Sequence, residues 1–206
     1  KKAEFASLLA GLGYDLVSLD ELGLAQSVDE TGATFEENAL LKARYYANLT
    51  GLVTLADDSG LEVDALQGEP GVRSARYAGE GASDQDRWRL LLDRLQSVPL
   101  ERRGARFRCA IGIAWPDGHF QTTHGVCEGV IATEPRGCHG YGYDPVFYLP
   151  QFGATMAELA PEERALAAEG LLAGLVIDEN VPEYGRGDFL MRGVLGGDRE
   201  TGALVV

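Results

Sequence analysis

The spacing of apolar residues predicts a chain in which helices and strands follow one another. Residues 5–12 repeat apolar side chains at helical intervals, and Gly13 is placed to end that helix before the extended stretch YDLVSL. Residues 34–49, TFEENALLKARYYANL, begin with Thr34 and Glu37 at the spacing of a capping box and carry apolar residues on one side. This pattern predicts a second helix.

Further along the chain the pattern changes to strands, and back to helices. The run LVTLA, residues 52–56, is apolar without alternation, which suits a strand covered on both faces, and DDSG is expected to end it in a turn. Residues 83–95 predict a third helix with a capping pair, and residues 160–174 a fourth with a proline in its first turn. Between them, the alternating ARFRCAIGIAW and the returning FQTTHGVCEGVI predict an antiparallel hairpin around PDGH.

The length and the patterning together predict one domain of two lobes. The chain has 206 residues, which is enough for one substantial core. After residue 174 short apolar runs are mixed with Gly and Asp, so no confident assignment follows there. We expect a domain over residues 1–174 and an atypical tail over residues 175–206.

Composition and charge narrow the possible partners. Hydrophobic residues make up 45% of the chain and charged residues 24%, and no apolar run approaches the length of a membrane helix, so we expect a soluble protein. The N-terminal residues lack the regions of a signal peptide, and three widely spaced cysteines suit reduced thiols in the cytoplasm. A net charge of −14 argues against polymeric nucleic acid as a partner, although a divalent metal can still bring a small polyanion to carboxylates.

Two adjacent acids, Asp57 and Asp58, follow the predicted buried strand directly. Adjacent strand residues point to opposite faces, so one acid can enter a cleft while the other is held by backbone N–H groups at the turn. Ser59 and Gly60 offer a hydroxyl and a flexible backbone to a phosphate. The alternative is an Asx turn that simply ends the strand.

Further carboxylates lie just upstream, around the start of the second predicted helix. Glu36 is explained by the positive end of the helix dipole, and Glu37 by the capping box, whereas Glu30 has no obvious structural task. Two or three carboxylates from different elements would suit one hydrated Mg²⁺, with one of them left to orient or deprotonate water. That arrangement is typical of phosphoanhydride cleavage.

The glycine-rich stretch GYGYDP, residues 140–145, is the other candidate for ligand binding. It can place an aromatic ring over a base while its glycines let backbone amides approach a ligand, or it can be a tight loop between strands. Cys138 and His139 precede it, but no second metal-type pair follows, so zinc is not expected.

Six stretches together resemble the inosine triphosphate pyrophosphatase family, which hydrolyses ITP, dITP and XTP. They are TFEENALLKA, ADDSGLEVDAL, GEPGVRSARYAG, RRGARFRCAIGIA, EPRG and GYGYDPVFYLP, in the family's order and spacing. The resemblance implies an elongated two-lobed α/β fold around a twisted mixed sheet with flanking helices, and a nucleotide cleft between the lobes. It also implies a homodimer and Mg²⁺-dependent attack of water on a nucleoside triphosphate, which releases the monophosphate and pyrophosphate.

The resemblance assigns roles to individual residues. Asp58 matches the family's proton acceptor and Mg²⁺ ligand, and Glu30 matches a second acidic metal site, which leaves Glu37 as a second-rank acid and Asp57 as support at the turn. Residues that match substrate contacts are Lys1, Ser59, Tyr141, Gly142, Tyr143 and Asp144, with Tyr141 in place of the usual base-stacking Phe.

One family segment is altered in this chain. Where the family reads E-E-K-x-x-x-S-H-R, this sequence reads EERALAAEG, so Arg164 replaces the Lys as a cation and nothing replaces Ser-His-Arg. That segment helps the family to read the 6-oxo group of the purine, so its loss affects base selectivity more than the phosphoanhydride chemistry. The alternatives are a pyrophosphatase for other modified nucleotides and a non-catalytic nucleotide-binding relative.

Overall fold

The computed structural model describes residues 15–172 and 203–205, and these residues form two compact units. Unit 1 holds described residues 15–58, 110–124 and 203–205, and unit 2 holds residues 59–109 and 125–172. The helices are α2 (Phe35–Thr50), α3 (Asp84–Arg94) and α4 (Pro161–Leu172), with short 3-10 helices η1 (Asp64–Leu66), η2 (Gly71–Arg76), η3 (Leu100–Arg102) and η4 (Met156–Glu158). The strands are β1 (Asp15–Val17), β2 (Val53–Val63), β3 (Gly104–Ala114), β4 (Phe120–Ile131), β5 (Phe147–Leu149), β6 (Ala154–Thr155) and β7 (Ala203–Val205).

The sheet is mixed, and β2, β3 and β4 contribute residues to both units. In unit 1 the strand order is β1-β7-β2-β3-β4, and β7 runs parallel to both β1 and β2. In unit 2 the order is β2-β3-β4-β5-β6, with β5 antiparallel to β4 and to β6. The predicted α/β class with a mixed sheet and helices is therefore confirmed.

Helix α2 is capped at both ends. Thr34 caps the N-terminus as predicted, but the Glu37 side chain does not close the predicted capping box, because it accepts from the Ala33 N–H instead. The Thr34 hydroxyl accepts a hydrogen bond from the Glu37 N–H at 3.1 Å, which satisfies one of the free donors of the first turn. Gly51 ends the helix in the left-handed conformation, with φ at 70°, and its N–H donates to the Ala47 carbonyl at 3.0 Å. The helix therefore begins and ends at defined residues.

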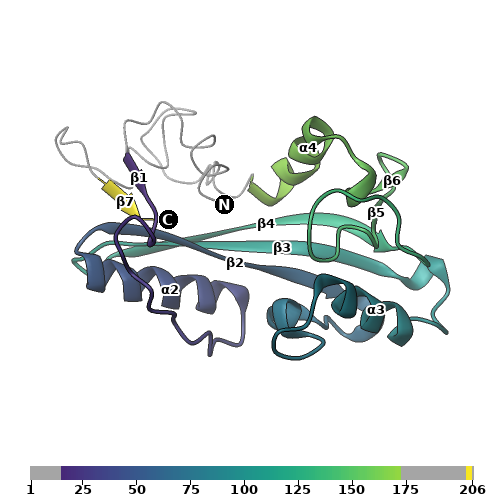
Figure 1. Cartoon of the computed structure of the whole chain (residues 1–206), viewed down its shortest axis with the longest axis horizontal. Helices are drawn as coiled ribbons and strands as arrows, with labels where there is room; N and C mark the ends of the chain where they lie inside the picture. Colours follow the sequence, from purple (N-terminus) through teal and green to yellow (C-terminus); the bar gives the residue numbers. More distant parts are fainter. Residues whose placement is uncertain (1–14, 173–202, 206) are drawn as a thin grey trace, which may run out of the picture. The chain divides into compact units, whose positions relative to one another are not determined.

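Helix α2 runs along one face of the unit 1 strands (Figure 1) and approaches them closely because its contact residues are small. Ala43 and Ala47 pack with Ala114 of β3 and with Ala56 of β2. At Gly112 of β3 an added Cβ would lie 3.0 Å from helix backbone atoms. The helix backbone therefore lies almost directly on the strand backbone.

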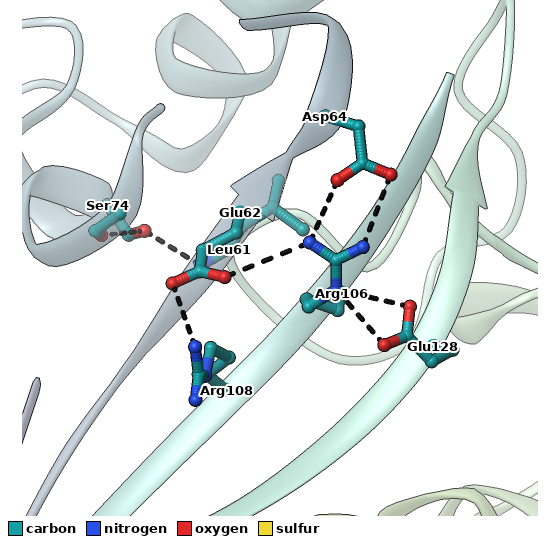
Figure 2. A network of polar contacts seen from close by, with 8 residues as sticks. Leu61, Glu62, Asp64, Ser74, Arg106, Arg108 and Glu128 are labelled. Carbon is teal, nitrogen blue, oxygen red and sulfur yellow. Dashed lines mark hydrogen bonds and ion pairs between the residues drawn. The ribbon is translucent and has the colours of Figure 1, made fainter. Parts of the chain in front are cut away.

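The strands of unit 2 bury one face and expose ion pairs on the other. Leu61, Val63, Ala105 and Cys127 belong to the core, together with Leu91 of α3 and Leu95, which caps that helix. On the opposite face Arg106 donates to Asp64 at 2.9 and 3.2 Å and to Glu128 at 3.0 and 3.2 Å, as Figure 2 shows. Glu62 lies 3.6 Å from Arg108 and 3.9 Å from Arg106. These half-exposed pairs add little stability each, but they join β2, β3 and β4 in one register.

The edge of β2 in unit 2 is covered by the segment that follows it. The Leu61 N–H donates to the Ser74 hydroxyl at 2.8 Å, and Ser74 belongs to η2. The Val63 N–H donates to the Glu69 carbonyl at 3.2 Å. Backbone donors that would otherwise lie open on a sheet edge are thereby satisfied.

Four sequence predictions need a correction or fall outside the described residues. The turn predicted at DDSG is wrong, because β2 continues without interruption from Val53 to Val63. In β3 the predicted alternation of buried and exposed residues stops after Cys109, since residues 110–114 are all buried. The predicted helix over residues 5–12 and most of the tail lie outside the described residues. Among the helices that are described, none is long and apolar enough to cross a membrane.

We predict that Gly112→Val destabilises the protein, because the new side chain must push the backbone of α2 away from β3. The free energy of unfolding, measured by urea denaturation, should fall by about 1–3 kcal/mol. Asn48→Ala on the exposed side of the same helix is the control and should change it by less than about 0.5 kcal/mol. An unchanged urea midpoint for Gly112→Val would contradict this packing.

Candidate active site

Asp58 points from β2 toward helix α2. On a strand, residues two apart share a face, and Ala56 already packs against Ala43 and Ala47 of α2. Asp58 therefore faces the same helix, where it contacts Asn38 and Lys42, which lie one turn apart. The side chain of Asp58 is only 12% exposed.

Three polar side chains surround the Asp58 carboxylate and form, with it, what we call the Asp58 cluster. The Asn38 amide donates to Asp58 Oδ2 at 3.0 Å. The Lys42 ammonium lies 3.5 Å from Asp58 Oδ1 and 2.8 Å from Glu30 Oε1. Glu30 and Asp58, the two acids predicted to act together, are therefore joined through one lysine.

Some features around Asp58 raise its pKa and others lower it. Burial raises the pKa of the Asp58 carboxyl, and the neighbouring Glu30 carboxylate adds to this rise. The Lys42 ammonium and the hydrogen bond from Asn38 oppose it, and the net result is a pKa above the usual value for aspartate. A carboxylate with a raised pKa is a stronger base and is better able to take a proton from water.

The donor set of the Asp58 cluster fits a hard divalent cation. Glu30 and Asp58 supply carboxylate oxygens, which are the ligands that Mg²⁺ prefers. Within the described part of the chain, no group of three or more His, Cys, Asp or Glu residues gathers to hold a metal. A cation here would be held by one or two carboxylates and would complete its shell with water and phosphate, which is the usual manner of Mg²⁺.

The other predicted acids have different positions. The Glu37 carboxylate accepts from the Ala33 N–H at 2.6 Å, so it holds the segment before the helix in place.

Asp57 neighbours Asp58 inside β2 and therefore points to the opposite face of the strand, away from α2. Its predicted role as support at a turn is wrong, because there is no turn at this point. Ser59 is exposed on the same strand and begins unit 2.

In unit 2 the loop of residues 140–144 is shaped by its own aspartate. The Tyr141 N–H donates to Asp144 Oδ2 at 3.0 Å. An added Cβ at Gly140, where φ is 79°, would lie 2.0 Å from that same carboxylate oxygen, so only glycine fits. The ring of Tyr141 is 72% exposed, whereas Tyr143 is buried and donates its hydroxyl to the Ser74 carbonyl at 2.9 Å.

A residue of α3 anchors this loop from outside. Asp84 accepts from the Gly142 N–H at 2.7 Å with one carboxylate oxygen, and Arg87 contacts the other at 2.5 Å. Because Asp84 is the first residue of α3, the helix N-terminus and the loop are held together. The four predicted loop residues thus form one structure, with Tyr141 directed outward and Tyr143 inward.

Asp144 and Arg164 interact electrostatically in the same region. Burial raises the pKa of Asp144 to about 6, against the opposing effects of the Tyr141 N–H and the positive charge of Arg164. The Nε of Arg164 is buried, and no hydrogen-bond partner for it occurs among the described residues. This donor is therefore unsatisfied within the described part of the chain.

Three residues of these sites were not singled out by their sequence pattern, namely Asn38, Lys42 and Asp84. A signal existed for Asn38, because it is a polar residue next to Ala39 on the buried side of α2. Lys42 lies one turn further along the same helix and so shares this side. Asp84 resembled an ordinary first-turn acid, and nothing in the sequence indicated its bond to Gly142. Lys1, predicted to contact phosphate, lies outside the described residues.

Comparison with known proteins gives a family match over most of the chain. The model of the Ham1 family matches residues 1–168. Proteins named dITP/XTP pyrophosphatase from Geobacter sulfurreducens and Yersinia pseudotuberculosis are both 51% identical to this chain, over 179 and 181 residues. Each match covers 86% of this chain, with 90% and 91% of those proteins. A protein of the same name from Bacillus subtilis is 47% identical over 164 residues, which is 80% of this chain and 83% of that protein.

Solved structures agree with this match. The Ham1 protein of Staphylococcus aureus superimposes with a TM-score of 0.77 at 39% identity, and the match covers 84% of this chain and 90% of that one. A protein of Mycobacterium abscessus, described as a nucleoside-triphosphatase and dITP/XTP pyrophosphatase, gives a TM-score of 0.75 at 42% identity over 86% and 92% of the two chains. The sequence matches and the solved structures therefore indicate the same family.

We predict that the Asp144 carboxyl titrates near pH 6 and that Arg164→Gln moves this midpoint to higher pH. The reason is that the Arg164 charge favours the ionised carboxylate, so its removal raises the pKa of Asp144. Carbon-13 NMR of the labelled carboxyl measures both values. Arg164→Lys keeps the charge and is the control. A midpoint that stays the same or falls in Arg164→Gln would refute the assigned interaction.

Proposed function

Because the chain belongs to the Ham1 family, we propose that it is a pyrophosphatase for non-standard purine nucleoside triphosphates. It hydrolyses dITP, ITP and XTP or dXTP to the monophosphate and pyrophosphate, and so removes them from the nucleotide pool. Relatives named dITP/XTP pyrophosphatase, about half identical over most of the chain, support this activity. The protein is an enzyme that acts on phosphoric anhydride bonds.

The observation that carries this proposal is the Asp58 carboxylate, which is nearly buried and held between Asn38 and Lys42. In the proposed reaction Asp58 orients the attacking water and accepts its proton. Its raised pKa suits this role, since an ordinary aspartate is a weak base at neutral pH. Its fixed position suits it too, because a base must lie within hydrogen-bond reach of the proton that it removes.

Glu30 and Lys42 complete the phosphate chemistry. Glu30 and Asp58 would hold Mg²⁺, which, when bound, offsets the negative charge that develops on the phosphates. Lys42 lies against both carboxylates, so it keeps the two acids close to each other. Glu37 remains a second-rank acid in this scheme, because its carboxylate is bonded to the Ala33 N–H.

The loop of residues 140–144 and Arg164 are assigned to nucleotide binding. Tyr141, which is exposed, is assigned to stack on the base, and Gly142, Tyr143 and Asp144 give the loop its shape. Arg164 supplies a positive charge for an anion, and Lys1 and Ser59 are further substrate contacts. A homodimer in the cytoplasm is part of the same proposal.

A second candidate is a pyrophosphatase of this architecture that acts on other modified nucleotides. The altered segment EERALAAEG, which lacks Ser-His-Arg, favours this variant because base selectivity depends on that segment in the resembling family. The chemistry at Asp58 would be the same in both cases. A relative that binds nucleotide without hydrolysing it is the third alternative.

We predict that the purified full chain, supplied with Mg²⁺, releases pyrophosphate from dITP and XTP faster than from dGTP. The measurement is pyrophosphate release from a panel that includes modified nucleotides. Selective turnover of another modified nucleotide would support the second candidate. Binding by calorimetry without release from any nucleotide would support the non-catalytic alternative and reject an enzyme.

We predict that Asp58→Asn lowers kcat by about 10² to 10⁴, because an amide cannot accept the proton of the water. The melting temperature and the circular dichroism spectrum should show a folded protein. Asp93→Asn is the matched control, since it makes the same change at an exposed position of α3 and should leave kcat unchanged. Turnover retained in Asp58→Asn would rule out Asp58 as the base.

A further inference from the structure

We propose that Asn38 is a positioning residue of the Asp58 cluster. Its side-chain amide connects the segment that carries Glu30 to the strand that carries Asp58, and it holds Oδ2 of Asp58 so that Oδ1 is the reacting oxygen. This inference rests on the proposed function and adds a residue to it that does not touch the substrate.

The orientation of the Asn38 amide is determined by its two partners. The Gly32 N–H lies 2.7 Å from one end of the amide, and a backbone N–H can only donate, so that end is Oδ1. The NH₂ end must then face Asp58 Oδ2, which lies 3.0 Å away and can accept. A flipped amide would set two donors against each other at Gly32 and two acceptors against each other at Asp58. A flip of the amide would therefore lose both bonds at once.

Because Asn38 is buried, its amide must find its hydrogen-bond partners within the protein, and these two bonds provide them. The residue is 0% exposed and lies on the side of α2 that otherwise buries apolar residues such as Phe35 and Ala39. An apolar side chain would fill this place without a polar atom to satisfy. The space is also closed from the other side, because a Cβ at Gly32 would lie 2.6 Å from Asn38 Oδ1. Gly32 and Asn38 thus belong to one contact.

Asn38 and Lys42 hold the two oxygens of Asp58 in different ways. Asn38 is short, neutral and enclosed, so its side chain has little freedom to leave Oδ2. Lys42 has a long flexible side chain, is partly exposed, and reaches Oδ1 only at 3.5 Å while it binds Glu30 at 2.8 Å. When phosphates enter, the ammonium can shift toward them, and Oδ1 is then the oxygen left for water. Asn38 keeps the carboxylate plane in place during that shift.

The test is Asn38→Asp, which has almost the same shape. The new carboxylate still accepts from the Gly32 N–H, but it has no donor for Asp58 and places a like charge beside it. We expect kcat for dITP to fall by about tenfold or more while KM changes by less than about threefold, since the substrate contacts are untouched. A residue with a purely structural role would lower the melting temperature without this split between kcat and KM.

Gly32→Ala perturbs the same contact while Asn38 itself is unchanged. Its Cβ would lie 2.6 Å from Asn38 Oδ1 and 2.8 Å from Glu37 Cβ, so the amide must shift, and the same loss of kcat is expected at nearly constant KM. This variant decides the matter if Asn38→Asp does not fold. Asn48→Asp is the matched control, because it makes the identical chemical change on the exposed side of α2 and should behave as wild type.

A structural readout complements the kinetics. In the wild-type protein labelled with nitrogen-15, the Gly32 amide and the Asn38 side-chain amide should exchange slowly with solvent, and fast exchange of both would overturn the inference. A wild-type kcat in folded Asn38→Asp or in folded Gly32→Ala would overturn it as well. If the wild type itself releases no pyrophosphate, the proposed function fails and the inference fails with it. An active wild type with active variants overturns the inference alone.

Discussion

The close approach of helix α2 to strands β2 and β3 is the constraint on which the Asp58 cluster depends. Alanines on the helix meet Ala56 and Ala114 on the strands, and Gly112 leaves no side chain between the two backbones. At this distance a side chain as short as Asn38 can reach the strand. Larger residues at the contact would move the helix outward, and the amide could no longer bind Asp58. Small-residue packing thus determines the geometry of the polar site.

A nearly buried carboxylate is costly unless it has partners, and here the partners also set its chemistry. Burial raises the pKa of Asp58, while Lys42 and Asn38 keep the ionised form stable. The same balance occurs in unit 2, where burial raises the pKa of Asp144 to about 6 and Arg164 opposes it. In both places an acid lies close to a cation but is not fully neutralised by it.

Much of the fold could be predicted from local patterns. The capping residue Thr34, the capping box at Ser83 and the hairpin around PDGH all form as expected, because these signals depend on residues only a few positions apart. The turn predicted at DDSG failed for the opposite reason. Asp, Ser and Gly favour turns locally, but β3 is the hydrogen-bonded neighbour of β2, and pairing along the sheet outweighs that preference.

By itself, the sequence determined the class of fold, the family and the acids on which the proposed chemistry depends. Asp58 and Glu30 could be named because the motif that carries each is local and distinctive. Only the tertiary structure decided what these acids contact. Asn38 lies 20 residues from Asp58 in the chain and Lys42 lies 12 residues from Glu30. Such contacts arise when a helix packs on a sheet, and no spacing along the chain specifies which oxygen meets which donor.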